Sequence, residues 1–563
     1  MSEGPRVTAV VLPGTHPDAP RRSLQDALAQ RGVALDVLVP DGLGAAPDAR
    51  VRRLPDGVGS HPAAVLAAAL GAGCAPWVAL LAAGDRWHPD HVRCGLEAAE
   101  AAGADWAYGS RVLLDASGEV TGIALADRPR HLASVLRHRN AVGGPSSVLC
   151  RTAILEEDRP FDPELRALTH WAAWMVLARR PAAACPEPLV AERPGAVLSV
   201  REPGAAWREL ERLRRDGRLT APDLLHAARA IRKAPARRAR HAPPRWLAPP
   251  SAIARAASGG EGPEVSVIVP TRNRPAFVRQ AVASALAQDV ALEVLVIDDA
   301  SDHPDALAAL DFADPRVRVL RRAEPGGAGR ARNDALGVAR GEWLAFLDDD
   351  DLMAPGRLAT HLQHVGDAGF SFCGQVLVDP ARHVVGVLPA PKPDDLAARL
   401  RVGSLIGGPS AVVVRTELAR DAGGFREDLY ALGDWDLWMA LAARARAVAL
   451  PELLVAYTVH PSNMHLRAPE RILEDFRRFD ALHGVGAPAE EALLAWLAED
   501  LAAHGRHRAA AAMHVRLARL RRRPGDAAPA LRAALRRDAA AAPAPDLEPC
   551  RWLAAYGDAG GGP

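Results

Sequence analysis

The sequence predicts an α/β protein with two related domains in tandem, each built on a mostly parallel sheet, and a helical region after them. Three observations support this fold class. Largely apolar strands, such as residues 265–269, alternate with helical stripes, such as residues 277–286. Five sequence blocks recur in one order at nearly constant spacing. Beyond residue 467 the pattern is helical, as in the leucines of residues 493–501.

The repeat defines the expected domain boundaries. Residues 10–13 return as 267–270, 36–39 as 293–296, 77–81 as 343–347, 143–146 as 407–410, and Trp171 and Trp174 as Trp435 and Trp438. We expect a first domain over 5–200, a linker with helical and flexible parts over 201–262, a second domain over 263–465, a helical region over 466–538 and a disordered tail over 539–563.

Composition excludes several classes of protein. The 563 residues include 69 Lys and Arg and 68 Asp and Glu, a net charge of +1, so we expect no nucleic-acid partner. None of the 6 cysteines has C-x-x-C spacing, which argues against zinc ribbons and thioredoxin-like motifs. No signal-peptide pattern is present and no apolar run approaches about 18 residues, so we expect a cytoplasmic protein. Basic runs at 237–240 and 519–523 leave peripheral contact with the inner membrane face open.

Acidic residues follow two predicted strands of the second domain. Asp298-Asp299 ends one strand and Asp348–Asp351 ends another. Ligands of such sheets bind at the carboxyl ends of the strands. Adjacent carboxylates without a neighbouring cation repel one another unless water or a metal neutralises them, and oxygen ligands suit Mg²⁺ or Mn²⁺. The alternative is a solvated acidic turn, which we expect for Asp394-Asp395, because no strand precedes that pair.

Two further features of the second domain point to a site. Gly327-x-Gly329 is part of a dinucleotide-binding pattern, but Arg332 stands where the third glycine belongs, so we reject that interpretation. We expect instead a turn, permitted by glycine, that directs Arg332 toward an anion. Asp434 precedes a helical stripe and is either a helix N-cap or a catalytic base, since both fit the pattern.

Together, these segments resemble the motifs of family 2 glycosyltransferases. The motifs are VSVIVPTRN at 265–273, VIDDAS at 296–301, ARN, GEW and LDDDD within 331–351, and GGF and DWDLW within 423–438. The resemblance covers about residues 263–460. It implies a Rossmann-like GT-A fold, a nucleotide-sugar donor, a divalent metal and inverting sugar transfer.

The resemblance also implies roles for individual residues. Asp350 would bind Mn²⁺ or Mg²⁺, and Asp434 would be the general base. The implied donor-binding residues are Pro270, Thr271, Arg272 and Asp299 at the nucleoside, Arg332 near the nucleotide, and Asp348 and Asp349 at the ribose and sugar. His460 either reaches the diphosphate or the metal, or is an ordinary loop histidine. The sequence departs from the family pattern at Gly433, where Glu is common, and at Arg272, where an aromatic residue is common.

The first repeat keeps packing residues and loses acids. AAGD at 82–85 stands for DDDD at 348–351, DG at 41–42 for DD at 298–299, and His170 for Asp434, whereas Trp171 and Trp174 remain. Acids that served only in solvated turns or as helix caps would not be lost selectively in this way. We therefore expect a catalytic second domain and a non-catalytic first domain.

The resulting hypothesis is a metal-dependent inverting glycosyltransferase that uses a UDP-, dTDP- or GDP-linked sugar. The acceptor, which is a sugar, lipid-linked or protein hydroxyl, stays open. One alternative is a non-catalytic scaffold that binds nucleotide sugars or glycans. The other is a nucleotidyltransferase, which usually has a lysine in its glycine-rich loop, and none occurs from Glu324 to Asn333.

Overall fold

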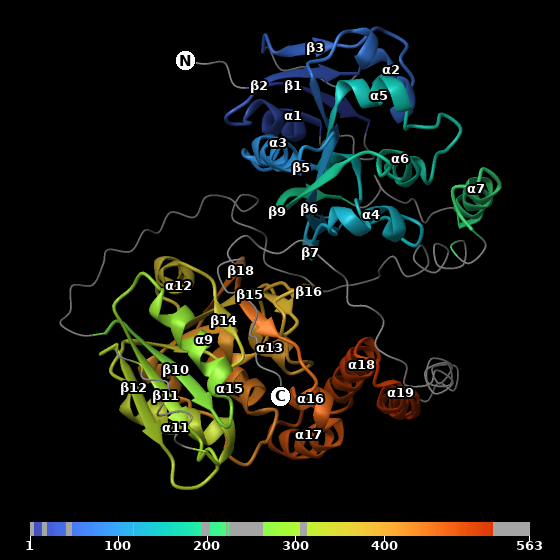
Figure 1. Ribbon diagram of the computed structural model, residues 1–563. Helices are drawn as coiled ribbons and strands as arrows, with labels where there is room; N and C mark the ends of the chain where they lie inside the picture. The colour runs from blue at the N-terminus through green and yellow to red at the C-terminus, as the bar shows by residue number, and fades with distance from the viewer. Residues whose placement is uncertain are drawn as a thin grey trace. The chain divides into compact units, whose positions relative to one another are not determined.

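The computed structural model describes residues 5–13, 20–40, 48–115, 118–193, 203–220, 223, 263–303, 312 and 314–521. They belong to two compact units, shown in Figure 1. The expected flexible part of the linker, the expected tail at 539–563 and the Asp41-Gly42 pair lie outside the described residues. Among the described helices, none has the length and apolar composition needed to cross a membrane.

Strands and helices alternate in the first unit. Its strands are β1 (Arg6–Leu12), β2 (Ala34–Val39), β3 (Val51–Arg53), β4 (Trp77–Ala82), β5 (Arg86–Trp87), β6 (Trp106–Leu114), β7 (Val120–Ala124), β8 (Val148–Arg151) and β9 (Ala182–Glu192). Its helices are α1 (Pro20–Leu28), α2 (Pro62–Gly71), α3 (His91–Ala102), α4 (Pro129–Leu136), η1 (Pro145–Ser147), α5 (Thr152–Asp158), α6 (Thr169–Leu177) and α7 (Pro203–Arg215). The sheet has the order β3-β2-β1-β4-β8-β6-β9-β5, with β7 beside β6.

The second unit repeats this arrangement. Its strands are β10 (Val265–Thr271), β11 (Leu292–Asp298), β12 (Val317–Arg321), β13 (Trp343–Phe346), β14 (Leu352–Met353), β15 (Phe370–Val378), β16 (Val384–Leu388), β17 (Val412–Arg415) and β18 (Ala447–Thr458). Its sheet has the order β12-β11-β10-β13-β17-β15-β18-β14, with β16 beside β15. The two orders correspond strand by strand, which confirms the prediction of two similar α/β sheets in tandem.

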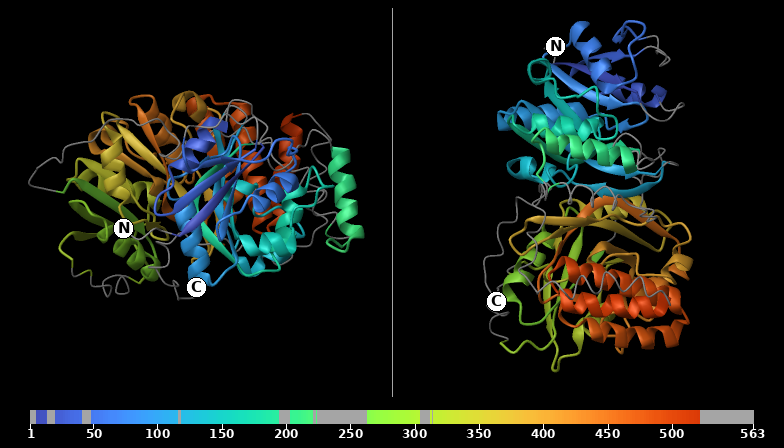
Figure 2. Two further views of the ribbon diagram at one scale, coloured as in Figure 1. Left: turned by 90° about the horizontal axis from the view of Figure 1, so that it is seen from above. Right: turned by 90° about the vertical axis from the view of Figure 1, so that its right-hand side faces the viewer.

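Helices cover both faces of the second sheet. They are α9 (Pro275–Leu286), α11 (Gly327–Val338), α12 (Arg357–Val365), α13 (Leu396–Leu400), η2 (Pro409–Ala411), α14 (Thr416–Asp421), α15 (Gly433–Ala442), α16 (Met464–Arg467), α17 (Pro469–His483), α18 (Ala487–Ala503) and α19 (His507–Arg521). Helices α9 and α12 pack on one face. The other face carries α11, α15 and the C-terminal helices, of which α18 and α19 lie side by side (Figure 2). Burial on both faces explains the continuous apolar composition of β10 and β11.

The parallel part of this sheet determines where a site can form. Strand β10 lies between β11 and β13 and is parallel to both, so the three carboxyl ends meet at one edge. Thr271 lies at the end of β10, opposite Asp298 of β11. The acidic turn at 348–351 follows β13 at the same edge.

Matching hydrogen bonds identify equivalent residues in the two units. Asp351 is buried at the end of the acidic turn and accepts hydrogen bonds from Ser410 Oγ at 2.6 Å and Thr458 N at 3.0 Å. In the first unit, Asp85 accepts from Ser146 Oγ at 2.6 Å and Arg193 N at 3.0 Å.

The same serines also fix the start of both turns. Ser146 Oγ accepts from Ala82 N, and Ser410 Oγ accepts from Asp348 N, each at 2.9 Å. The acid retained in the first unit is therefore the one that closes the turn onto neighbouring strands. The three positions without an acid are Ala82, Ala83 and Gly84.

We predict that Asp85→Ala and Asp351→Ala each lower the free energy of unfolding of their own unit by at least about 2 kcal/mol, because each leaves two buried or part-buried donors without an acceptor. Calorimetry of the full chain, with the transition of each unit followed separately, measures the effect. Asp394→Ala, at an exposed position, is the control and is expected to leave both transitions unchanged. Unchanged unfolding in the two test variants would contradict a structural role for these acids.

Candidate active site

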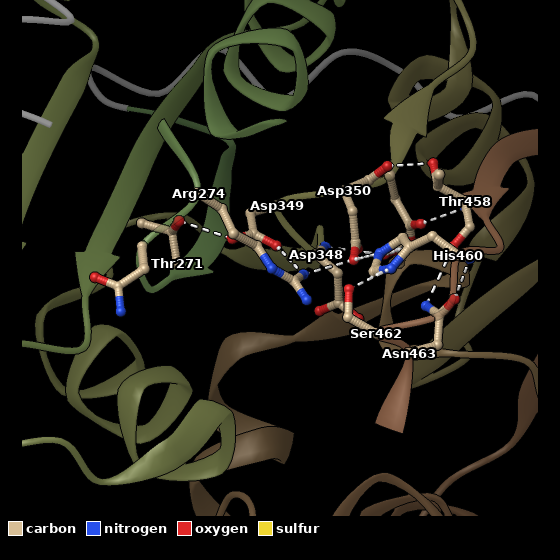
Figure 3. Close-up of polar contacts among 12 residues, drawn as sticks. Thr271, Arg274, Asp348, Asp349, Asp350, Thr458, His460, Ser462 and Asn463 are labelled. Carbon is tan, nitrogen blue, oxygen red and sulfur yellow. Dashed lines mark hydrogen bonds and ion pairs between the residues drawn. The ribbon is translucent and has the colours of Figure 1, made fainter. Parts of the chain in front are cut away.

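The candidate site lies where the acidic turn meets β10 and the end of β18 (Figure 3). Asp350 Oδ2 is 2.8 Å from His460 Nε2 and accepts a 2.7 Å hydrogen bond from Arg274 Nη1. His460 is held in turn, since its Nδ1 lies 2.8 Å from Ser462 Oγ and its ring stacks on Phe277. His460 is buried.

Asp349 is buried beside Asp350 and faces β10. Its carboxylate accepts from Thr271 Oγ1 at 2.7 Å and from Arg274 Nη1 at 3.1 Å. Desolvation and the charge of Asp350 raise the pKa of Asp349 to about 7. Although desolvation acts in the opposite direction, the His460 hydrogen bond and the Arg274 charge hold the pKa of Asp350 below its usual value.

Arg274 corrects one premise of the sequence analysis, which assumed that the four acids have no neighbouring cation. The guanidinium reaches across the sheet edge and lies between Asp349 and Asp350 (Figure 3). Arg274 stands just before α9, 75 positions from Asp349 in the sequence, and no spacing rule connects the two. The sequence signal for this contact is an arginine three positions after the end of β10, in a domain with an acidic strand end.

A second group joins Asp348, Arg332 and Asp434. Arg332 Nη2 donates to Asp348, and the guanidinium lies over the ring of Phe425 at 5.0 Å. The expected turn ends before Arg332, because the positive φ is at Gly327 and Arg332 is inside helix α11. Arg332 Nε is buried and has no hydrogen-bond partner among the described residues, which leaves one donor for an anionic ligand.

Asp434 lies inside the first turn of α15 and is not its N-cap, which is Leu432. Its Oδ1 accepts from Trp435 N at 2.7 Å. Desolvation raises the pKa of Asp434 to about 6, helped by Asp348 and opposed by the Trp435 hydrogen bond and the Arg332 charge. A carboxylate with this pKa is a stronger base than an exposed one and is still mostly ionised at neutral pH.

The remaining predicted donor residues lie elsewhere on the edge. Both oxygens of Asp299 accept backbone N–H groups, from Gly326 and Gly327 at 2.8 Å each, so this carboxylate holds the start of α11. Pro270 is buried within β10. Arg272 is exposed and lies 3.6 Å from Asp302. The structure thus joins Thr271, Asp348, Asp349, Asp350, Arg332, Asp434 and His460, and leaves Arg272 to one side.

Asp350 and His460 are the donors that fit a divalent cation. A carboxylate oxygen and an imidazole nitrogen 2.8 Å apart suit Mn²⁺, or Mg²⁺ through the carboxylate. Within the described part of the chain, no group of three or more His, Cys, Asp or Glu residues is arranged to hold a metal. Such a cation therefore needs ligand phosphates or water to complete its shell, as Mg²⁺ does in many nucleotide sites.

This α/β unit gathers carboxylates, arginines and a histidine at the ends of its strands, and the pKa of Asp434 at the start of α15 is raised. Such a combination is typical of sites that bind an anionic, hydroxylated ligand. Residues 266–384 match the profile of glycosyl transferase family 2. The matched residues lie within the second unit, which is therefore similar to this family.

Individual relatives match this chain over only part of its length. The succinoglycan biosynthesis protein ExoO of Rhizobium meliloti (strain 1021) is 42% identical over 119 residues, which cover 21% of this chain and 33% of that protein. The UDP-Glc:alpha-D-GlcNAc-diphosphoundecaprenol beta-1,3-glucosyltransferase WfgD of Escherichia coli is 33% identical over 130 residues, 23% of this chain and 51% of that protein. Other leading curated relatives are covered to at most 66% of their length, so the chain spans less than two thirds of them.

Among solved structures, the mannosyltransferase PcManGT from Pyrobaculum calidifontis, in complex with GDP-Man and Mn²⁺, is 24% identical with a TM-score of 0.33. The likeness covers 52% of this chain and 91% of that one.

We predict that Arg274→Ala lowers the melting temperature of the second unit at pH 8 and lowers it less at pH 5.5. Arg274 compensates the charges of Asp349 and Asp350, and Asp349, with a pKa of about 7, is mostly protonated at the lower pH. Added Mn²⁺ is expected to restore part of the loss at pH 8. Thermal unfolding at the two pH values measures this.

The matched control is Arg272→Ala, an exposed arginine two positions away that contacts neither acid. An equal loss of melting temperature for both variants, or a loss independent of pH, would show that Arg274 acts through packing alone.

Proposed function

We propose that the second unit transfers a sugar from a nucleoside-diphosphate sugar to an acceptor hydroxyl, with inversion at the anomeric carbon. The observation that carries the proposal is the grouping of Asp434, Arg332 and Asp348 next to Asp350 and His460 in a unit whose residues 266–384 match family 2. It gives one base, one anion-binding arginine and one cation-binding pair at a single sheet edge.

The proposed chemistry uses these residues in distinct roles. Asp434 accepts the proton of the acceptor hydroxyl as the oxygen attacks the anomeric carbon. The bond between that carbon and the diphosphate breaks, and the diphosphate leaves with the electron pair. Arg332, with its unpaired Nε, stabilises the negative charge that develops on the leaving group. Asp348 holds Arg332 and is available to a sugar hydroxyl.

A divalent cation held by Asp350 and His460 would supply Lewis-acid stabilisation of the departing diphosphate. Thr271 and Arg274 position the Asp349–Asp350 pair on which that binding depends. We propose Mn²⁺ or Mg²⁺ as the cofactor.

The donor in this proposal carries a UDP, dTDP or GDP group. Support comes from the names of the relatives, since the Escherichia coli relative is a glucosyltransferase that uses UDP-Glc and a diphosphoundecaprenol-linked acceptor. A hydroxyl of a sugar or of a lipid-linked sugar is therefore the first acceptor class to test, ahead of a protein hydroxyl.

We propose that the first unit is non-catalytic and that the domain boundaries are those of the repeat, 5–200 and 263–465. The turn at Ala82-Ala83-Gly84 offers no carboxylate, and Asp85 is occupied by Ser146 and Arg193. His170 replaces the base on α6. This unit keeps the frame of the sheet and lacks the side chains that the proposed chemistry uses.

A panel of nucleotide sugars tests the proposed function. Ligand binding raises the melting temperature by mass action, and release of UDP, dTDP or GDP in the presence of Mn²⁺ reports turnover. Binding without release would favour the scaffold alternative, and release of diphosphate from a nucleoside triphosphate would favour nucleotidyl transfer. No binding to any donor would contradict the proposal.

We predict that Asp434→Asn lowers kcat by at least about 100-fold with donor affinity unchanged, because the base is lost and the nucleotide contacts remain. In the wild type, Asp434 must be ionised to accept a proton, so kcat/KM should fall about tenfold per pH unit below a pH near the pKa of about 6. Steady-state kinetics from pH 5 to 8 measure both effects. Normal turnover with a lower melting temperature would assign Asp434 to the stability of α15.

We predict that Asp350→Ala abolishes transfer and the Mn²⁺-dependent part of nucleotide binding, because His460 alone is a poor site for a hard cation. Isothermal titration of UDP with and without Mn²⁺ measures this, with Asp394→Ala as the control. The same variant tests the first unit, which is intact in it. Mn²⁺-dependent binding that persists in Asp350→Ala would contradict a non-catalytic first unit.

A further inference from the structure

Trp496 differs from the other described tryptophans of the second unit. Trp343, Trp435 and Trp438 are fully buried, whereas Trp496 on α18 is 48% exposed. Leaving a large apolar ring in water forgoes the stabilisation that burial gives. Single exposed apolar residues are common on protein surfaces, so the groups around the indole decide whether it is a candidate contact for a ligand.

Polar groups surround this indole on one side. His465 of α16 packs against it with ring centroids 5.5 Å apart. Asp500 lies one helical turn beyond Trp496 on the same face of α18, and its Oδ2 is 3.3 Å from His465 Nε2. Asp500 Oδ2 is buried and makes no hydrogen bond within the described residues, and the other oxygen, Oδ1, lies 3.5 Å from His504 Nδ1. An aromatic face, an imidazole and a carboxylate acceptor therefore lie together.

This group is connected to the candidate active site through β18 and the turn after it. Helix α16 starts at Met464, directly after the Ser462-Asn463 turn that holds His460. Tyr457 of β18 directly precedes Thr458, whose backbone N–H donates to Asp351 in the acidic turn.

We propose that Trp496, His465 and Asp500 form a subsite for a neutral pyranose ring of the acceptor, beside the catalytic residues. This inference rests on the proposed function, because it assigns the acceptor side of that site. The apolar C–H face of a pyranose packs on an indole, and its hydroxyls donate to the carboxylate and exchange hydrogen bonds with the imidazole. The occupant is a sugar ring of a glycan or of a glycolipid headgroup.

Charge argues against an anionic membrane as the occupant. Helix α18 carries Glu490, Glu491, Glu499 and Asp500 and no Lys or Arg. The arginines of the neighbouring α19 are partly neutralised, since Arg516 pairs with Glu470 and Arg521 with Glu491. Anionic lipids attract basic surfaces and are repelled by an acidic one.

The test is saturation-transfer NMR on the full-length protein, with the methyl glycosides of glucose, galactose, mannose and N-acetylglucosamine as probes. We expect transfer to the ring C–H protons of at least one probe. Trp496→Ala should weaken that affinity at least about fivefold, and Trp496→Phe should recover part of it, since stacking on an aromatic face contributes about 1 kcal/mol. Asp500→Asn should also weaken binding, because a charged acceptor is replaced by a neutral one.

Trp207→Ala is the matched control, because Trp207 is similarly exposed, at 44%, on α7 of the other unit. It should leave sugar binding unchanged, and Trp496→Ala should leave nucleotide binding and nucleotide release without acceptor unchanged. No saturation of any probe by the wild type, or full affinity in Trp496→Ala, overturns the subsite. Sedimentation with anionic vesicles that Trp496→Ala abolishes also overturns it, in favour of a lipid surface.

The two proposals fail separately. Sugar binding that depends on Trp496 without any nucleotide-sugar binding contradicts the transfer reaction and leaves a glycan-binding site. Nucleotide-sugar turnover with no effect of Trp496→Ala on the stimulation by methyl glycosides contradicts only the subsite.

Discussion

Repulsion among the carboxylates at the end of β13 is the constraint around which the second unit is arranged. Each of the four acids has its own compensation: Arg332 at Asp348, Thr271 and Arg274 at Asp349, Arg274 and His460 at Asp350, and Ser410 with a backbone N–H at Asp351. These partners come from β10 and the loop after it, from α11, from the end of β18 and the turn after it, and from η2. The acidic turn therefore couples elements that are far apart in the sequence, and a ligand that changes the charge there acts on all of them.

The two units share their sheet topology and the hydrogen bonds of the turn, but they differ in the number of acidic residues in that turn. The hydrogen bonds of Asp85 reproduce those of Asp351, whereas Ala82, Ala83 and Gly84 replace the other acids. The turn can thus be built with a single carboxylate. The three additional acids of the second unit are not needed for the backbone, and their repulsion has to be offset by arginines and a histidine, which is the cost expected of a functional site.

Much of this organisation could be predicted from the sequence, because strand periodicity and a repeat are local patterns. The strands at 265–269, 293–297 and 343–347 and the shared edge for Asp299 and Asp350 followed from such patterns, whereas the role expected for Asp434 came from the resemblance. The separate roles of the four aspartates at 348–351 could not be predicted in this way. Their side chains are identical, and only the path of the turn decides which partner each of them meets. Arg274 and the carboxylate of Asp299 were also missed as structural partners, because their contacts depend on side-chain reach across the sheet. Arg332 was expected on a turn, but the helix begins at Gly327 and includes it.

The identical strand order of the two sheets has a consequence for folding. A chain that contains the same sheet twice offers each strand a second partner of similar sequence, which is the situation in which neighbouring domains misassemble. Here the last long strand of the first sheet, β9, ends at Glu192, and the first strand of the second, β10, begins at Val265. At about 5–20 residues per second, a ribosome takes several seconds to synthesise the intervening segment. The intervening segment thus separates the two sheets in time, so that the first can close before a competing strand emerges.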